Sequence, residues 1–375
     1  MPVDLSHTLI VAVSATALFD LTESEAFFEQ ARAADPTTAA EKFRQYMIAR
    51  EHMPLKTGSG YPLIRALLNL NRYQPQTETL DAVIRPLVEV VIMSKNSPDT
   101  GIQVLNALRA HGLPISRSAF TSGMGVADYV ADFNVDLFLT TNHADAQQVT
   151  DAGVCACAIL DAPPIDMAAL DTDQLRIAFD GDAVLFDEAG ELLSRTEGLQ
   201  AFHDFEDRMS DVPMNKGPYA DFLIKLSQLQ RRLPMSLVTP PIQIALVTAR
   251  NAPADVRAIK TLREWGVNVD LAFFLGGLEK TAVLKTFAPH IFFDDSIHNY
   301  DAAKTVVPSG LVPYRSESQL FAAIQNDDGH TLMPPHISLP VRKLKSKTAK
   351  AQPSTAQTKT VTDVSKMTHN TSNIL

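Results

Sequence analysis

Short apolar runs alternate with amphipathic segments along most of this chain of 375 residues, and this alternation limits the folds open to it. The clearest predicted strands, each four to six residues long, are Leu9–Val13, Val88–Met93, Asp136–Leu139, Leu175–Phe179, Ile242–Val247 and His290–Phe293. Predicted helices lie between them, and two of these, Thr100–His111 and Pro253–Trp265, are each followed by a terminating glycine. Runs that are apolar throughout are typical of strands covered by helices on both faces. The pattern therefore predicts an α/β protein with a parallel sheet.

The pattern also repeats within the chain. With a constant offset of 154 residues and no gap, residues 91–142 align with residues 245–296, so that strand, helix, glycine and second strand coincide. Seven of the 52 aligned positions are identical, among them Gly112 with Gly266 and Gly123 with Gly277. This predicts two Rossmann-like halves related by a degenerate internal duplication. The alternative is that any two strand–helix–strand segments share these features.

Composition separates a folded body from a tail. Residues 329–375 contain seven of the 33 Lys and Arg residues and one of the 43 acids, which leaves 26 basic and 42 acidic residues in the body. The net charge of −10 is therefore −16 for the body and +6 for the tail. An acidic body argues against broad nucleic-acid binding, because a phosphate backbone needs a Lys and Arg surface. The tail is poor in large apolar residues, and we expect it to be disordered.

Two further features bear on location. The apolar run at Leu9–Val13 lacks the basic flank and the length of a secretory signal. No apolar stretch reaches the ~18 residues that a membrane-spanning helix needs. We therefore expect a cytoplasmic protein with no membrane partner.

Two carboxylates flank a glycine directly after the strand predicted at Leu175–Phe179. Asp180 and Asp182, with Gly181 between them, lie where open α/β sheets collect their ligands and catalytic groups. Gly181 presents backbone amides without a side chain in the way. Acids at this spacing can serve as a nucleophile and a proton donor, provided that a cation suppresses the charge of the first. An isolated Asp-x-Asp is more often a solvated turn, and the motifs downstream decide against that interpretation.

Two later strands end in residues suited to a phosphate and a metal ion. Thr248 follows the strand predicted at Ile242–Val247 and leads into a helix, whose amino-terminal amides can hold a phosphate oxygen. Lys280 lies near the start of the next helical segment and can supply a fixed positive charge. Asp294 and Asp295 follow the last strand, and their oxygens can complete an octahedral shell around Mg²⁺.

In this order the motifs resemble those of the haloacid dehalogenase-like (HAD-like) superfamily, and they are closer still to the cytosolic 5′-nucleotidase I family. The matching segments are Phe-Asp-Gly-Asp-Ala-Val-Leu-Phe at 179–186, Leu-Val-Thr-Ala-Arg at 246–250, Lys-Thr-Leu-Arg at 260–263 and Pro-His-Ile-Phe-Phe-Asp-Asp at 289–295. Ile-Val-Ala-Val-Ser at 10–14, Ala-Leu-Phe-Asp at 17–20 and Gly-Pro at 217–218 match as well. The resemblance runs from about residue 8 to residue 315.

The resemblance implies Mg²⁺-dependent hydrolysis of nucleoside 5′-monophosphates of the AMP or IMP type. By motif, Asp180 attacks phosphorus to give an aspartyl-phosphate, and Asp182 protonates the leaving ribose oxygen and then acts as base toward water. Thr248 and Lys280 hold the phosphoryl oxygens. The implied metal ligands are Asp180, the carbonyl oxygen of Asp182, and the pair Asp294 and Asp295. An acid at position 182 suits an alkoxide leaving group, which needs a proton, better than a halide.

The resemblance also divides the chain into parts. It implies a catalytic HAD-like domain at residues 166–328 with a helical cap inserted at about 188–241. A non-catalytic α/β half at residues 1–165 precedes it, and the basic tail at 329–375 follows. The residues expected to bind substrate are Gly181, Ala249, Arg250, Phe205 and Lys216. For Phe205 and Lys216 the alternatives are a core aromatic residue and a loop lysine.

The amino-terminal half has no charge at any position of the implied site. The catalytic residues Asp180, Asp182, Thr248, Lys280, Asp294 and Asp295 align with Ser14, Thr16, Ser94, Val126, Thr140 and Thr141. We therefore expect this half to be a scaffold, or to bind a nucleoside or an effector nucleotide. The residues that would bind such a ligand are Ser14, Ser94, Asn96, Thr140 or Asn142.

Other functions stay open at this point. A phosphotransferase or a broader small-molecule phosphatase would use the same nucleophile. A non-catalytic nucleotide-binding protein would keep the motifs without turnover. Self-association into a homo-oligomer is open as well.

Overall fold

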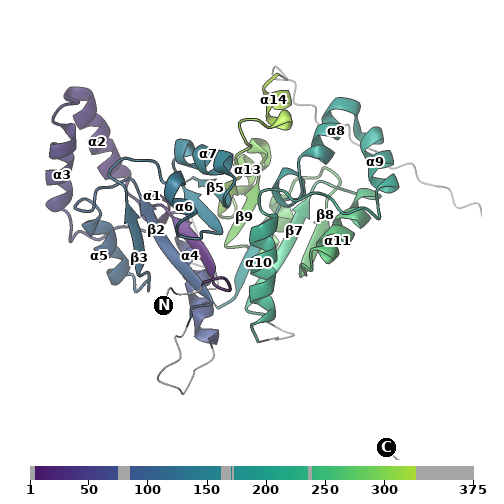
Figure 1. The fold of residues 1–375 in the computed structure, drawn as a ribbon, viewed down its shortest axis with the longest axis horizontal. Coiled ribbons are helices and arrows are strands. Elements are labelled where there is room, and N and C mark those ends of the chain that lie inside the picture. The colour runs from purple at the N-terminus through teal and green to yellow at the C-terminus, as the bar shows by residue number, and fades with distance from the viewer. Residues whose placement is uncertain (1–4, 75–84, 162–169, 171–172, 235–238, 327–375) are drawn as a thin grey trace, which may run out of the picture. The chain divides into compact units, whose positions relative to one another are not determined.

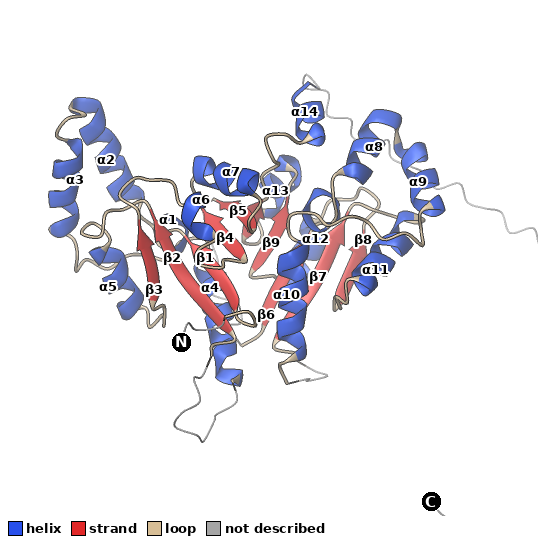
Figure 2. Ribbon diagram, viewed as in Figure 1, coloured by secondary structure: helices blue, strands red, loops and turns tan. Residues whose placement is uncertain are grey.

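One mixed sheet forms the centre of the computed structural model, which describes residues 5–74, 85–161, 170, 173–234 and 239–326. Figure 2 shows the strands between layers of helices. The strands of the described residues are β1 (Leu9–Val13), β2 (Val88–Ser94), β3 (Arg117–Phe120), β4 (Leu137–Thr140), β5 (Ala156–Leu160), β6 (Leu175–Phe179), β7 (Ile242–Thr248), β8 (Leu271–Phe274), β9 (Ile291–Asp294) and β10 (Ser309–Leu311).

Helices connect these strands and cover both faces of the sheet (Figure 1). In the first half they are α1 (Ala15–Leu18), α2 (Thr22–Ala34), α3 (Ala39–Ile48), α4 (Tyr61–Asn69), α5 (Ile102–Ala110), α6 (Ala127–Val130) and α7 (His143–Ala152), with a 3₁₀ turn at Leu70–Tyr73. In the second half they are α8 (Ala189–Glu197), α9 (Leu199–Arg208), α10 (Ala220–Arg231), α11 (Ala254–Glu264), α12 (Thr281–Phe287), α13 (Ile297–Ala303) and α14 (Gln319–Asn326), with a π-type turn at Gly181–Leu185.

The sequence predicted the central elements closely. All six predicted strands are present, and their ends differ by no more than one residue. Gly112 and Gly266 follow α5 and α11 with φ of 65° and 67°, the left-handed conformation that ends a helix and that glycine adopts without strain. The strands β1, β2, β6 and β7 are buried almost throughout, as their continuous apolar runs indicated.

The strand order is β3-β2-β1-β4-β5-β10-β9-β6-β7-β8. Every neighbouring pair is parallel except β5 and β10, which are antiparallel. This confirms the predicted α/β fold class. On one face a single apolar core contains residues of both halves, including the buried side chains of α4 and α10, whereas the other face has a separate core for each half.

The two halves repeat one topology. Strands β3-β2-β1-β4-β5 all come from the first half, and β8-β7-β6-β9-β10 come from the second in the corresponding order. The pairing of Val91 with Arg117 becomes that of Ala245 with Leu271, an offset of 154 residues for both partners. At the level of topology and register, the structure supports the predicted duplication.

The repeat extends to segments that the sequence alignment did not cover. Helices α2 and α3 follow β1, and α8 and α9 follow β6 at the corresponding place (Figure 1). After each helix pair a glycine returns to the strand end: the Gly58 amide donates to the Leu18 carbonyl and the Gly217 amide to the Leu185 carbonyl, both at 2.8 Å. Gly58 and Gly217 are 159 residues apart. The first half therefore has its own counterpart of the predicted cap helices.

Two expectations concern other parts of the chain. The basic tail at 329–375 lies outside the described residues. Among the described helices, none has the length and apolar character needed to cross a membrane.

Candidate active site

The carboxyl end of β6 holds the predicted nucleophile. The Asp180 amide donates to the Phe293 carbonyl (2.9 Å), which continues the β6–β9 pairing and brings Asp180 beside the end of β9. The Asp180 carboxylate accepts from the Gly181 amide at 2.6 Å. In the turn that follows, Ala183 has φ of 57°. This left-handed conformation costs an L-residue about 1–2 kcal/mol, and such strain is typical of functional turns.

Lys280 lies between two of the predicted acids. Its Nζ is 2.6 Å from Asp180 Oδ2 and 2.7 Å from Asp294 Oδ2, and the residue is 5% exposed. Burial opposes its charged form, but the charges of Asp180 and Asp294 more than compensate and raise the pKa of Lys280. The loop before Lys280 is attached to the end of β7, because the Gly277 amide donates to the Ala249 carbonyl at 3.1 Å.

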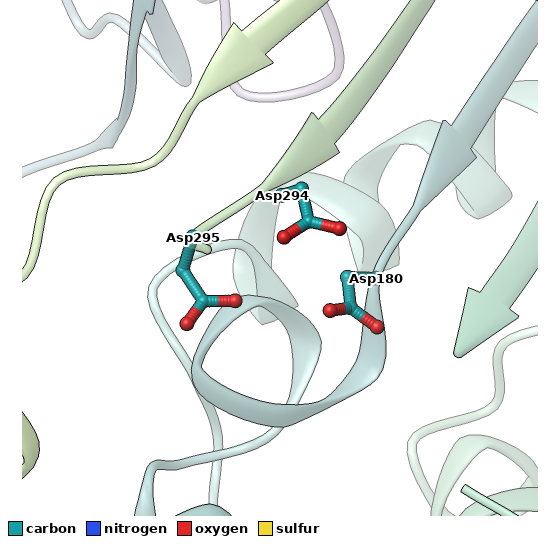
Figure 3. Close-up of side chains that lie close together, drawn as sticks. All are labelled: Asp180, Asp294 and Asp295. Carbon is teal, nitrogen blue, oxygen red and sulfur yellow. The ribbon is translucent and has the colours of Figure 1, made fainter. Parts of the chain in front are cut away.

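Three buried carboxylates converge at this edge of the sheet, as Figure 3 shows. Asp180, Asp294 and Asp295 each offer one oxygen, and these three oxygens lie within 4.8 Å of one another. Burial raises the pKa of Asp180 to about 7 although Lys280 acts in the opposite direction. Burial and the neighbouring acids raise the pKa of Asp295, whose carboxylate accepts a hydrogen bond from the Tyr314 hydroxyl. Carboxylates crowded in this way are stabilised by a cation, and an all-oxygen ligand set suits Mg²⁺. The cluster therefore fits a divalent metal ion.

Thr248 ends β7 against the same turn. Its side chain is almost fully buried, and its Oγ1 accepts from the Arg250 amide at 3.3 Å. A Cβ added at Gly181 would lie 3.0 Å from Thr248 Oγ1. Glycine at this position thus allows close packing of the turn against the Thr248 side chain.

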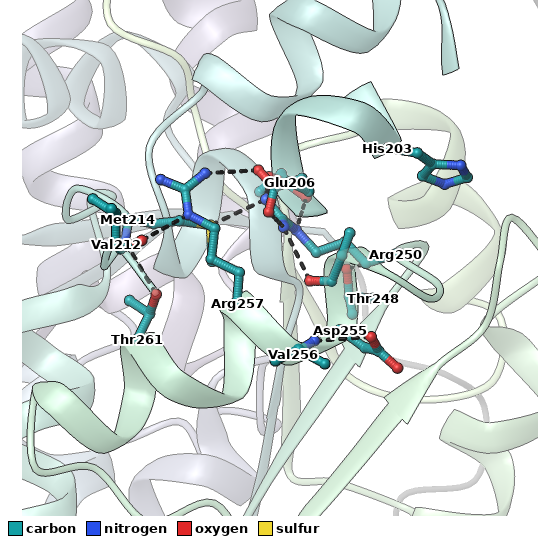
Figure 4. Close-up of polar contacts among 12 residues, drawn as sticks. His203, Glu206, Val212, Met214, Thr248, Arg250, Asp255, Val256, Arg257 and Thr261 are labelled. Atoms are coloured by element: carbon teal, nitrogen blue, oxygen red, sulfur yellow. Dashed lines mark hydrogen bonds and ion pairs between the residues drawn. The ribbon is translucent and has the colours of Figure 1, made fainter. Parts of the chain in front are cut away.

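The Asp182 carboxylate is bound by Arg250 through two hydrogen bonds, and Figure 4 shows Arg250 beside Glu206 and Arg257. Arg250 Nε donates to Asp182 Oδ2 at 2.8 Å and Arg250 Nη2 donates to Asp182 Oδ1 at 2.6 Å. The remaining amino group, Nη1, donates to Glu206 Oε2 at 2.7 Å, and Arg257 Nη1 donates to Glu206 Oε1 at 2.8 Å. Burial opposes the charge of Arg250, and the two carboxylates raise its pKa. The side chain of Asp182 thus belongs to an ion-pair network, and its predicted role as a metal ligand concerns its backbone carbonyl alone.

The other residues expected to bind substrate lie at the rim of this region. Phe205, on α9, lines a cavity of about 250 Å³ and has the Arg257 guanidinium 5.3 Å from its ring centroid. Lys216 pairs with Asp221 at 2.6 Å and lines a separate cavity of about 660 Å³. Neither side chain belongs to the carboxylate cluster, and their roles toward substrate stay predictions.

Sequence reasoning missed Glu206, Arg257 and Tyr314. Each lies outside the quoted motifs, although Arg257 is on α11 just before the motif at 260–263, so only tertiary packing brings it to the site. One signal was available for Glu206, because it follows the buried Phe202 by one helical turn and therefore lies on the apolar face of α9. An acid on an apolar helix face requires a buried partner.

The corresponding place in the first half is filled by hydroxyl groups and one ion pair. Ser14 Oγ is 3.1 Å from Thr16 Oγ1, and Thr141 donates to Thr16 Oγ1 at 2.6 Å. Lys95 Nζ lies 2.6 Å from the buried Asp145. The expected binding of a nucleoside or effector here stays a prediction.

The fold and the site together define an α/β protein with a carboxylate and lysine centre at the carboxyl edge of one half of its sheet. The family model described as 5′-nucleotidase matches residues 1–319, and the chain belongs to this family. It is also similar to the human protein named cytosolic 5′-nucleotidase 1B, with 31% identity over 301 residues, which are 80% of this chain and 47% of the relative. The chain thus spans about half the length of that relative. Both findings confirm the resemblance drawn from the motifs.

Proposed function

We propose that the protein is a Mg²⁺-dependent phosphohydrolase that releases phosphate from nucleoside 5′-monophosphates of the AMP or IMP type. The observation that carries this proposal is the convergence of Asp180, Asp294 and Asp295 around Lys280 at the ends of β6 and β9. Family membership supports the reaction class. The name of the human relative supports a nucleotide substrate and a cytoplasmic location.

In the first proposed step, a carboxylate oxygen of Asp180 forms a bond to phosphorus while the bond from phosphorus to the ribose 5′-oxygen breaks. Asp182 enters this step in its protonated form and gives its proton to that oxygen, so the nucleoside leaves as a neutral alcohol. In the second step, Asp182 takes a proton from water as the water oxygen bonds to phosphorus. The bond from phosphorus to Asp180 breaks, which regenerates the carboxylate and releases inorganic phosphate.

Lys280 and Thr248 support both steps. The ammonium of Lys280 limits the charge of Asp180 and is placed to neutralise the phosphoryl oxygens, and Thr248 lies beside Gly181, the residue that follows the nucleophile. Asp180, the Asp182 carbonyl, Asp294 and Asp295 would hold the Mg²⁺, which when bound supplies Lewis-acid stabilisation of phosphoryl charge.

The remaining parts take supporting roles in this proposal. Helices α8 and α9 form the part of the inserted segment at 188–241 that covers the site, whereas the buried side chains of α10 belong to the apolar core. Residues 1–165 form a non-catalytic half, because hydroxyls stand where the second half has carboxylates.

A substrate profile tests the proposal. Phosphate release is measured with Mg²⁺ for AMP, IMP, GMP, CMP, UMP and a set of non-nucleotide phosphoesters. We expect turnover of purine monophosphates and its loss in Asp180→Asn, by about 10⁴-fold or more. The matched control is Asp145→Asn, an isosteric change of a buried acid in the first half, which should retain activity.

Four outcomes would contradict the proposal. Full activity of Asp180→Asn overturns the nucleophile. A flat profile over all phosphoesters replaces the nucleotidase by a general phosphatase, and transfer of phosphate to added nucleoside in preference to water replaces it by a phosphotransferase. Tight AMP binding without any turnover indicates a nucleotide-binding protein.

A further inference from the structure

The ion-pair network around Arg250 connects the proposed proton donor to the cap. Arg250 follows β7, Arg257 lies on α11 of the core, and Glu206 lies on α9 of the cap. Glu206 is fully buried, and each of its two oxygens accepts from a different arginine. With Asp182, the network contains two acids and two arginines. Glu206 on α9 binds Arg250, and Arg250 binds Asp182. Among the described contacts, α9 is therefore connected to Asp182 through Arg250 alone.

The cap also approaches this pair closely through its backbone. A Cβ added at Gly190, near the start of α8, would lie 2.8 Å from Asp182 Oδ1 and 3.0 Å from Arg250 Nη2. The Asp182 and Arg250 side chains are thus enclosed between both cap helices and the core. Two parallel hydrogen bonds from a planar guanidinium fix the plane of a carboxyl group as well as its place.

The first half shows that the fold does not need these charges. The same offsets that align the two halves place Thr16, Asn96 and Gln103 at the positions of Asp182, Arg250 and Arg257. The offset of 159 residues that relates Gly58 to Gly217 places Met47, which is buried on α3, at the position of Glu206.

One hydrogen bond from a side chain to a backbone carbonyl is present at the corresponding place in both halves. Gln103 Nε2 donates to the Met53 carbonyl at 3.2 Å, and Arg257 Nε donates to the Val212 carbonyl at 2.8 Å at the corresponding place. The helix-pair counterpart in the first half therefore makes a similar contact with its core without the Glu206–arginine ion pairs, and its Arg44 pairs with Asp99 at another position of α3. The whole charged network is present where the proton donor is present, and it is replaced by neutral residues where the donor is replaced.

We propose that Arg250 is a positioning residue that aims the Asp182 carboxyl at the leaving oxygen of the substrate, and that Glu206, held by Arg257, sets the place of Arg250 when the cap is seated. This inference rests on the proposed function. Asp182 must present its proton to the ribose 5′-oxygen while the bond from that oxygen to phosphorus breaks, and small misplacements slow such a step strongly. Arg250, expected from the sequence to bind substrate, acts here on the proton donor.

The test compares two leaving groups in the full-length protein with Mg²⁺. In the first step the nucleoside of AMP leaves as an alkoxide and needs the proton, whereas p-nitrophenyl phosphate releases a stable phenolate and does not. The second step is common to both substrates, so the first step is measured alone, as release of adenosine or p-nitrophenolate in a single turnover. In Glu206→Gln we expect this rate to fall by about 10- to 100-fold for AMP, with the rate for p-nitrophenyl phosphate and both KM values within about threefold of wild type. In an Asp182→Asn background, Glu206→Gln should cause no further loss.

Two further variants keep the test independent of folding. Glu206→Met combined with Arg257→Gln copies the Met47 and Gln103 pair of the first half and removes one acid and one base together. It should fold and show the same selective loss for AMP. The matched control is Asp211→Asn, which breaks the ion pair between Asp211, after α9, and Lys260 of α11 without touching the network. It should leave both substrates unaffected.

The outcomes separate this inference from the proposed function. Equal losses for AMP and p-nitrophenyl phosphate in both Glu206 variants, or additive losses with Asp182→Asn, overturn the positioning role. A wild-type protein that turns over neither substrate overturns the proposed function itself.

Discussion

The two halves of the sheet share topology and register, and they differ in where their charges lie. In the second half, three carboxylates and Lys280 are buried together at the strand ends. In the first half, hydroxyls take the places of the carboxylates and Val126 takes that of Lys280. The hydroxyls of Ser14 and Thr141 both bond to Thr16, and Lys95 forms an ion pair with Asp145. Buried like charges are costly unless a cation or ligand balances them. The fold is therefore stable without the charged site, and the second half retains its acids for a purpose other than folding.

The largest effect that would sharpen this comparison is expected at Asp182, the proposed proton donor. Asp182→Asn should lower kcat for AMP by about 10³-fold, because general acid catalysis contributes about 10²- to 10⁴-fold. The change at the equivalent position of the first half, Thr16→Val, should leave kcat within about twofold of wild type. Among the described contacts, the Thr16 hydroxyl bonds only to neighbouring hydroxyls. Steady-state kinetics on both variants checks this. Equal losses at the two positions would show that both halves contribute to turnover.

A smaller loss of activity is expected when the buried Lys280 is replaced. Lys280→Met removes the cation between Asp180 and Asp294 and should lower kcat by about 10²-fold. It should also destabilise the metal-free protein by about 3–5 kcal/mol, because two buried carboxylates lose their partner. Chemical denaturation measures the second effect. Lys95→Met breaks the pair with Asp145 in the first half and should affect stability while kcat stays near wild type. A fall in kcat for Lys95→Met would contradict the non-catalytic assignment.

The smallest expected effect is on the free energy of unfolding, and it depends on pH. Burial raises the pKa of Asp180 from 3.8 to about 7, so in the metal-free protein this group stabilises the fold at low pH and loses that contribution as pH rises toward 7. Mg²⁺ binds the deprotonated carboxylates, so its stabilising effect should grow between about pH 5.5 and pH 8. At 100 times its Kd, Mg²⁺ should add about 2.7 kcal/mol to the free energy of unfolding.

Thermal unfolding with Mg²⁺ and with EDTA at several pH values measures this difference. Asp295→Asn should reduce the gain, and Asp145→Asn in the first half should leave it intact. A gain that is independent of pH, or one that persists in Asp295→Asn, would place the metal elsewhere.

The sequence revealed what depends on local pattern. Central strands such as β1 and β7 are continuous apolar runs, and residues at the carboxyl ends of parallel strands meet at one edge of a sheet, so the pattern alone predicts that Asp180 and Asp294 lie together. Strands β3 and β8 were not among those expected, because each is four residues long and only partly buried at an outer edge of the sheet.

Residues that only tertiary packing brings to the site could not be predicted from the sequence pattern. Glu206 reaches Arg250 only because α9 folds back over the core, 44 residues away in the chain. For Phe205 the sequence left two alternatives, a ring that binds substrate and a core aromatic residue, because helical spacing does not distinguish them. In the structure the Arg257 guanidinium lies 5.3 Å from its ring centroid. The ion-pair network thus depends on how the cap folds onto the core, whereas the carboxylate cluster follows from the order of the strands.

The antiparallel pairing of β5 with β10 joins the two halves of the sheet and has a consequence for self-association of the protein. Each of these strands would be an exposed edge if its half stood alone, and pairing with the other protects both. The sheet then ends at β3 and β8, two strands of four residues each. Short edges offer few free backbone groups for strand addition by another chain. Self-association of this protein would therefore rely on its helical surfaces, where charge and shape can exclude unrelated partners.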